Sequence, residues 1–158
     1  MDRDGPLGDS LHDLTEGTTE AVETLVSLWA RASQTVSPRL SALQLEALLI
    51  TRRNPSINLT GLAVEVGAAP PAVSRLCDRL EAAGLLRRQP VPTSRREIGL
   101  VLTLRGNEIV DALFARRSEL FGDVLTRMPA ASRREFLAGL EAFSEAARAS
   151  DFNSGEQA

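Results

Sequence analysis

The most regular pattern of apolar and polar positions lies in the middle of the chain, over residues 70–83. Apolar residues recur there at intervals of three and four, the spacing of one face of an amphipathic helix: Val73, Leu76, Cys77 and Leu80. The opposite face carries short polar groups and two arginines, among them Ser74, Arg75 and Arg79. We predict a helix whose apolar face packs on a core and whose polar face is open to a ligand.

A shorter helix is predicted just before it, over residues 59–66. Asn58 is a good side-chain cap for the first turn of this helix, and Gly67 supplies the tight turn that follows. Two short helices joined by a turn that contains glycine form a helix-turn-helix. In that arrangement the second helix lies in the major groove of DNA.

After Gly84 the apolar period changes from that of a helix to that of a strand. Residues 85–88 and 98–102 are predicted strands, and Ile57 can add a short third one. The turn-forming residues between them are Pro90, Pro92, Thr93 and Ser94, and Arg95 and Arg96 follow. An arginine-tipped ribbon suits the minor groove, whose negative potential attracts guanidinium groups.

Longer helices are predicted on both sides of this segment, over residues 13–34, from Ser41 to about residue 53, from Thr103 to Pro129, and over 131–149. We expect a mainly α fold with a small β-ribbon (α+β), built as one domain over residues 13–150. The winged helix-turn-helix would occupy residues 41–104. A flexible arm over 1–12 and a polar tail over 151–158 would lie outside it.

The helices over 13–34 and 104–149 keep apolar faces that a winged helix of about fifty residues does not need for its own core. We expect these faces to associate in a homodimer, because two modules about 34 Å apart are needed to read successive major-groove turns of an operator. A monomeric helical bundle is the alternative.

Several short motifs in the central segment carry a family likeness. The segment resembles the multiple antibiotic resistance regulator (MarR) family of bacterial winged-helix transcription factors. The matching residues are Leu62-Ala63 with Gly67, Ala72 to Leu76, Asp78 to Glu81, Gly84-Leu85, Arg95-Arg96, and Leu102-Thr103 with Gly106.

The resemblance implies a dimeric transcriptional repressor of a pseudo-palindromic operator. It also implies release from double-stranded DNA by a small anionic or phenolic ligand, bound between the dimerisation helices and the winged helix. Trp29 is the candidate ligand-binding residue, although an aromatic residue on a helical stripe more often belongs to a core.

Two positions depart from the family pattern. Ser94 stands where the family usually has an aspartate that orients the wing arginine. Ala69, Pro70 and Pro71 stand where the family often has a serine or threonine cap on the recognition helix. This replacement removes hydrogen-bond donors and predicts more apolar contact at that end of the helix.

The charge distribution agrees with DNA binding, although the chain as a whole carries a net charge of −3. Residues 1–51 carry −5, residues 52–105 carry +5 and residues 106–158 carry −3, so the positive charge is concentrated in the winged helix. All eighteen basic residues are arginine, whose fork binds phosphate and guanine bidentately.

We assign DNA-contacting roles to nine residues. Those expected at base edges or nearby phosphates are Pro70, Pro71, Ser74 and Arg75; those expected on the backbone are Arg79, Asn58 and Thr60; those expected in the minor groove are Arg95 and Arg96. Two of these residues have structural alternatives. Arg79 can instead pair with Asp78 or Glu81 on its own helix, and Asn58 can be only a cap.

The remaining composition argues against an enzyme. The chain has one histidine, His12, and one cysteine, Cys77, which cannot together form a disulfide, a zinc site or a nucleophilic triad. Cys77 is either a thiol sensor or, as its apolar stripe favours, a small core residue. We expect no cofactor or metal and, from the acidic start and the lack of a long apolar run, a cytoplasmic protein without membrane contact.

Two other functions remain open. The winged helix can be a module that binds a protein partner, as the acidic flanks allow, or a constitutive DNA-binding protein that has no ligand.

Overall fold

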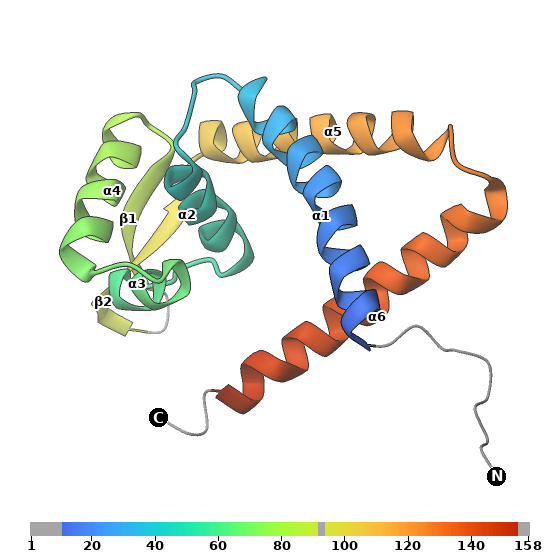
Figure 1. Ribbon diagram of the computed structural model, residues 1–158. Coiled ribbons are helices and arrows are strands. Elements are labelled where there is room, and N and C mark those ends of the chain that lie inside the picture. The colour runs from blue at the N-terminus through green and yellow to red at the C-terminus, as the bar shows by residue number, and fades with distance from the viewer. Residues whose placement is uncertain (1–10, 92–93, 155–158) are drawn as a thin grey trace, which may run out of the picture. The chain divides into compact units, whose positions relative to one another are not determined.

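The computed structural model describes residues 11–91 and 94–154, and gives no side-chain placement for 94–96 and 150–154 (Figure 1). The elements follow in the order α1 (Leu11–Gln34), α2 (Ala42–Arg53), α3 (Leu59–Val66), α4 (Pro70–Ala82), β1 (Leu86–Val91), β2 (Ser94–Leu102), α5 (Leu104–Leu125) and α6 (Ala130–Ser154). They form two compact units, residues 1–117 and 118–158. The mainly helical fold with a small ribbon confirms the predicted fold class.

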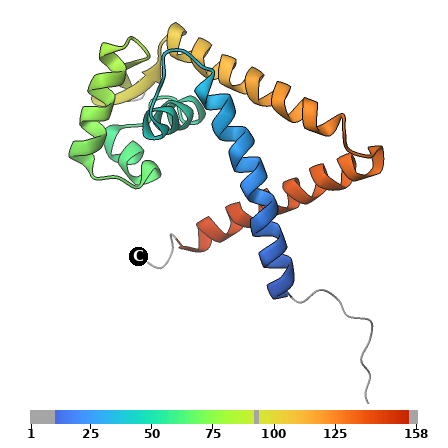
Figure 2. The same ribbon diagram turned by 45° about the horizontal axis from the view of Figure 1, so that its top comes forward.

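The core of the first unit lies between α2, α3, α4, the ribbon and the beginning of α5, and Figures 1 and 2 show the first four of these close together. The stripe predicted for α4 is buried in full: Val73, Leu76, Cys77 and Leu80. The side chains that meet it come from the neighbouring elements, among them Leu48, Ile50, Leu62 and Leu100. Burial of this stripe fixes which face of α4 is left for solvent.

Local hydrogen bonds cap α2, α3 and α5 at the starting positions that the sequence predicts. Ser41 and Gln44 form a reciprocal capping box at the start of α2. Asn58 accepts a hydrogen bond from the backbone N–H of Gly61 at 2.7 Å, which caps α3. Gly67 ends α3 with a φ of 67°, a conformation that side chains other than glycine rarely adopt. The Thr103 hydroxyl caps α5 by accepting from the N–H of Gly106 at 3.0 Å.

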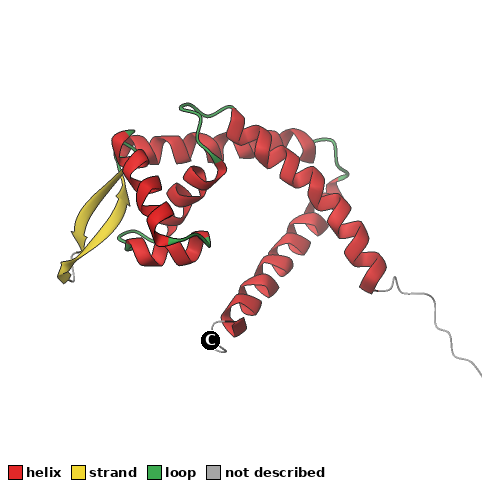
Figure 3. Cartoon of the chain, turned by 60° about the vertical axis from the view of Figure 1, so that its left-hand side comes forward, coloured by secondary structure: helices red, strands yellow, loops and turns green. Residues whose placement is uncertain are grey.

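The ribbon is longer than the sequence predicts, and Figure 3 shows it as two yellow arrows. β1 and β2 pair antiparallel from Leu86 opposite Leu102 to Val91 opposite Ser94, with an irregularity between Pro90 and Val91. Placing Pro90 and Ser94 in a loop was therefore wrong. Proline is tolerated on an edge strand and at a bulge, because a missing N–H costs no ladder bond there.

The predicted third strand is present as one bridge, in which Ile57 pairs with Leu100. The backbone of Ser56 approaches β2 so closely that a Cβ at Gly99 would lie 2.6 Å from the Ser56 carbonyl oxygen. The bridge therefore depends on a glycine at position 99.

The terminal helices extend beyond their predicted ends. α1 begins at Leu11, so His12 lies in a helix and not in an arm, while residues 1–10 lie outside the described residues. α6 continues to Ser154, into the segment expected to be a tail. In the described part of the chain, no helix combines the length and the apolar composition needed to cross a bilayer.

Candidate functional site

The outer face of α4 presents an exposed arginine pair. Arg75 and Arg79 are both exposed, and neither has a hydrogen bond or an ion pair within the described residues. Pro70 and Pro71 are exposed in the first turn of the same helix, and Ser74 is half-buried. The fold thus brings the five residues predicted for α4 to its solvent side, where unpaired guanidinium groups are available to an anion.

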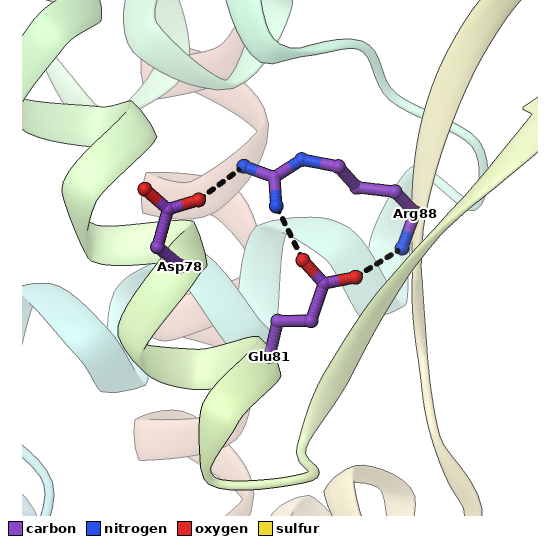
Figure 4. Close-up of polar contacts among 3 residues, drawn as sticks. All are labelled: Asp78, Glu81 and Arg88. Carbon is purple, nitrogen blue, oxygen red and sulfur yellow. Dashed lines mark hydrogen bonds and ion pairs between the residues drawn. The ribbon is translucent and has the colours of Figure 1, made fainter.

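Arg88 on β1 forms ion pairs with Asp78 and Glu81, the two carboxylates considered above as partners of Arg79 (Figure 4). Its Nη2 donates to Asp78 Oδ1 at 2.7 Å, and its Nη1 forms an ion pair with Glu81. The backbone N–H of Arg88 also donates to Glu81, at 3.2 Å. The hydrogen bond to Asp78 is the largest of the effects that raise the pKa of Arg88 above its ordinary value. Arg88 therefore connects β1 of the ribbon, the wing of the fold, to α4, and it leaves Arg79 without an ion pair in the described residues.

Arg88 is not among the site residues predicted from the sequence. The available signal was a pair of acidic residues three positions apart on one helix, Asp78 and Glu81, with a basic strand directly after it. Which of the two strand arginines would turn inward depended on the register of the ribbon, since neighbouring strand residues point to opposite faces.

We expect Arg88→Met to lower the free energy of unfolding by about 1 kcal/mol, the upper end for a partly exposed ion-pair network. The matched control is Arg87→Met, because Arg87 is the exposed neighbour on the same strand and its loss removes the same charge. Its effect should stay within about 0.5 kcal/mol. Urea unfolding followed by circular dichroism measures both variants, and equal losses would contradict the tie between wing and helix.

The other predicted contacts lie at two further places. Asn58 and Thr60 are exposed at the start of α3, where Asn58 also serves as the cap. The backbone of Arg95 and Arg96 lies in β2, near the end of the ribbon, and their side chains are outside the described residues. The effect of Ser94 on the wing arginine stays a prediction for the same reason.

A small polar pocket of about 310 Å³ joins the start of α2 to α4. Arg75 and Arg79 line it together with Ser41 and Gln44, the two residues of the α2 capping box. The two arginines are therefore close to polar groups of a second helix, and this face is wider than α4 alone.

A larger pocket of about 740 Å³ lies between α1, α2 and the middle of α5. Trp29 lines it and is 44% exposed, so Trp29 is not part of the buried core of the described chain. Leu45 and Leu49 of α2 and Phe114 of α5 supply apolar walls, and Arg117 supplies a charge. Glu46, Arg52 and Arg53 also line the pocket, and Arg52 is paired with Asp111 at 2.8 Å. A largely apolar cavity that contains a few charged groups is typical of sites for small organic ions.

Arg117 is the most unusual charged group of the described residues. It is only 6% exposed, and its guanidinium carbon lies 3.9 Å from the centre of the Trp29 ring. Its Nε is buried and donates to no acceptor, and no ion pair of Arg117 is found in the described part of the chain. Burial lowers the pKa of this guanidinium. A buried cation without an anion is costly, so this geometry favours a bound anion.

Cys77 lies on the core side of α4 and is fully buried. Burial raises the pKa of its thiol, which keeps the group in the unreactive protonated form at neutral pH. This placement agrees with the structural interpretation of Cys77.

These features define a winged-helix protein with a basic recognition helix. The chain belongs to the MarR family of DNA-binding transcriptional regulators: the family profile matches residues 40–98, and a relative described next is similar over nearly the whole chain. No curated protein sequence matches the chain.

Three solved structures illustrate the similarity. RV1404 from Mycobacterium tuberculosis is 32% identical, with a TM-score of 0.80, over 90% of this chain and 97% of that chain. The MarR-like transcriptional regulator tm0816 from Thermotoga maritima is 24% identical, with a TM-score of 0.66, over 82% and 96%. BpsR from Bordetella bronchiseptica, whose DNA binding is regulated by 6-hydroxynicotinic acid, is 20% identical, with a TM-score of 0.57, over 89% and 98%. The last two show the shared fold alone.

Proposed function

We propose that this regulator is a dimeric repressor that reads a pseudo-palindromic operator with α4 and the wing. The observation that carries the proposal is the exposed arginine pair of α4, Arg75 and Arg79, which has no partner in the described residues although two carboxylates lie on the same helix. Because Arg88 neutralises those carboxylates, the charge of the pair is available to phosphate and guanine.

The remaining contacts follow from where the elements lie. Ser74 and Arg75 would reach base edges, Arg79, Asn58 and Thr60 would hold the phosphate backbone, and Arg95 with Arg96 would enter the minor groove. The exposed side chains on α3 and α4 support the first two groups of contacts.

Dimerisation is supported by apolar side chains that the single chain leaves exposed. On α1 these are Leu11, Leu14, Val22 and Val26, which are 40% to 81% exposed. On α6, Leu137 and Phe143 are 56% and 64% exposed. Faces of this kind on both terminal helices suit a two-fold interface between copies of the chain. Such a dimer would place two recognition helices on one operator.

A small organic anion in the pocket beside Trp29 would be the releasing ligand. The buried guanidinium of Arg117 supplies the charge for a carboxylate, and the rings of Trp29 and Phe114 supply flat apolar contact. BpsR, which has this fold, is regulated by such an aromatic acid. To release DNA, the ligand must bind more tightly to a conformation with the wrong half-site spacing.

Selection from random-sequence duplexes tests the DNA-binding part of the proposal. The full chain should enrich an inverted repeat whose half-sites are about one helical turn apart, and its affinity should fall steeply with salt. Light scattering on the protein–DNA complex should show two chains per duplex. A lack of enrichment, with weak binding that vanishes as salt is raised, would overturn the proposal and favour a protein partner.

A further inference from the structure

The first turn of α4, residues 70–73, has an exposed apolar surface in which no backbone N–H is left free to donate. Pro70 and Pro71 have no backbone N–H. The N–H groups of Ala72 and Val73 both donate to the carbonyl oxygen of Ala69, at 2.9 and 3.2 Å. Ala69 itself is the N-cap and makes no side-chain hydrogen bond. An α-helix normally begins with several unsatisfied N–H groups, so α4 departs from the rule at the end expected to meet DNA.

This lack of donors limits what the surface can recognise. Phosphate oxygens and the purine N7 and O6 atoms are acceptors, and they need a donor that this turn does not have. The carbonyl oxygens of this turn point toward the C-terminal end of the helix, away from the exposed tip, and the Ala69 oxygen already accepts two bonds. The one apolar group that base pairs present in the major groove is the C5-methyl of thymine. The surface therefore matches thymine and no other base edge.

The charged part of the same helix fixes where this surface would lie. Arg75, one turn further on, is exposed and has no partner in the described residues, so it can bind a base edge or phosphate when the helix enters the groove. Pro70 and Pro71 are exposed on the preceding turn. A helix that inserts its first turns into the major groove would bring both prolines close to bases.

We propose that Pro70 and Pro71 are specificity-determining residues that pack against thymine methyl groups in each half of the operator. The inference rests on the proposed function, since it assumes that α4 enters the major groove. It adds a base preference that the exposed arginines do not provide: one or two thymines per half-site, selected by apolar contact.

Replacing thymine by deoxyuridine, one position at a time, tests this inference in the enriched operator. The replacement removes only the methyl group and keeps the base pair. We expect one or two positions in each half-site to lose about fourfold in affinity, the value for one buried methyl-sized group. All other thymines should tolerate the change. The scan uses the unaltered protein and so does not depend on the folding of a variant.

The matching protein variant is Pro70→Ala with Pro71→Ala. It keeps a residue type that favours helices but removes the ring carbons of both prolines. In this variant the deoxyuridine penalty should fall close to onefold at the same positions. Pro129→Ala, which changes an exposed proline just before α6, is the control and should leave the penalty unchanged.

The outcomes separate this inference from the proposed function. If an operator is enriched but the deoxyuridine scan is flat, or if the penalty is the same in the double proline variant, the thymine contact is wrong while the regulator stands. If no operator is enriched, the proposed function itself fails, and the inference fails with it.

Discussion

Gly106→Ala should be among the most destabilising single substitutions in this protein. Gly106 is buried in the first turn of α5, and a Cβ added there would lie 2.0 Å from the carbonyl oxygen of Leu85. The clash is with backbone, so no side-chain rotation relieves it. Leu85 is fully buried, and its carbonyl oxygen accepts a hydrogen bond from the N–H of Thr103 at 3.1 Å. We expect a loss of about 3 kcal/mol or more in the free energy of unfolding, at the upper end for overpacking.

The control for this substitution is Gly122→Ala in the same helix. A Cβ at Gly122 meets nothing within 4 Å, so the usual helix preference for alanine should raise stability by up to about 1 kcal/mol. Urea unfolding followed by far-ultraviolet circular dichroism gives both values. The expected signs are opposite, and similar stabilities for the two variants would show that α5 does not approach the backbone of Leu85 as closely as described.

The close approach at Gly106 also has a functional consequence. α5 leaves the end of the wing and carries Phe114 and Arg117 to the pocket beside Trp29. A helix pushed away from Leu85 would therefore displace the pocket wall together with the base of the wing. The positions of both the pocket beside Trp29 and the DNA-binding wing therefore depend on the absence of a side chain at Gly106.

The second large effect is expected from Arg117→Met, which should abolish most of the response to aromatic acids. The variant keeps an unbranched side chain in the apolar pocket and removes the buried charge. A charge-assisted hydrogen bond to a guanidinium contributes about 1.5–3 kcal/mol, so the dissociation constant of 4-hydroxybenzoate or 6-hydroxynicotinate should rise at least about tenfold. Trp29 is the sole tryptophan, and its fluorescence reports binding directly.

Arg79→Met provides the crossed control for this experiment. Arg79 lies on the exposed face of α4 and does not line the pocket beside Trp29. Arg79→Met should lower operator affinity and its salt dependence while leaving ligand binding unchanged, and Arg117→Met should do the reverse. If the unaltered protein binds neither acid, or if both variants bind them equally well, Arg117 is not the anion-binding group.

The sequence alone determined the elements whose signals are local. The stripe of Val73, Leu76, Cys77 and Leu80 defined α4, because residues three and four apart share one face of a helix. Ser41, Asn58 and Thr103 marked helix starts, since a capping side chain bonds to N–H groups only a few residues away. These patterns were enough to predict the winged helix and its family.

Tertiary packing decided what depends on residues far apart in the chain. The choice of Arg88 over Arg79 as the partner of Asp78 and Glu81 followed from the ribbon register, which turns Arg88 toward α4. The strand continues through Pro90 because this residue lies opposite Ile98 on an edge strand. The missing N–H of a proline costs no hydrogen bond of the ladder at such a position.

The pocket is the clearest case of a feature that no local pattern carries. Trp29 and Arg117 belong to helices at opposite ends of the first compact unit's sequence, and only folding sets the guanidinium 3.9 Å from the centre of the indole ring. The sequence placed Trp29 on the apolar stripe of α1, but it did not identify Arg117 as the side chain that the indole ring contacts. Sequence periodicity specifies which face of a helix is apolar, whereas the partner of that face is decided by the packing of the whole chain.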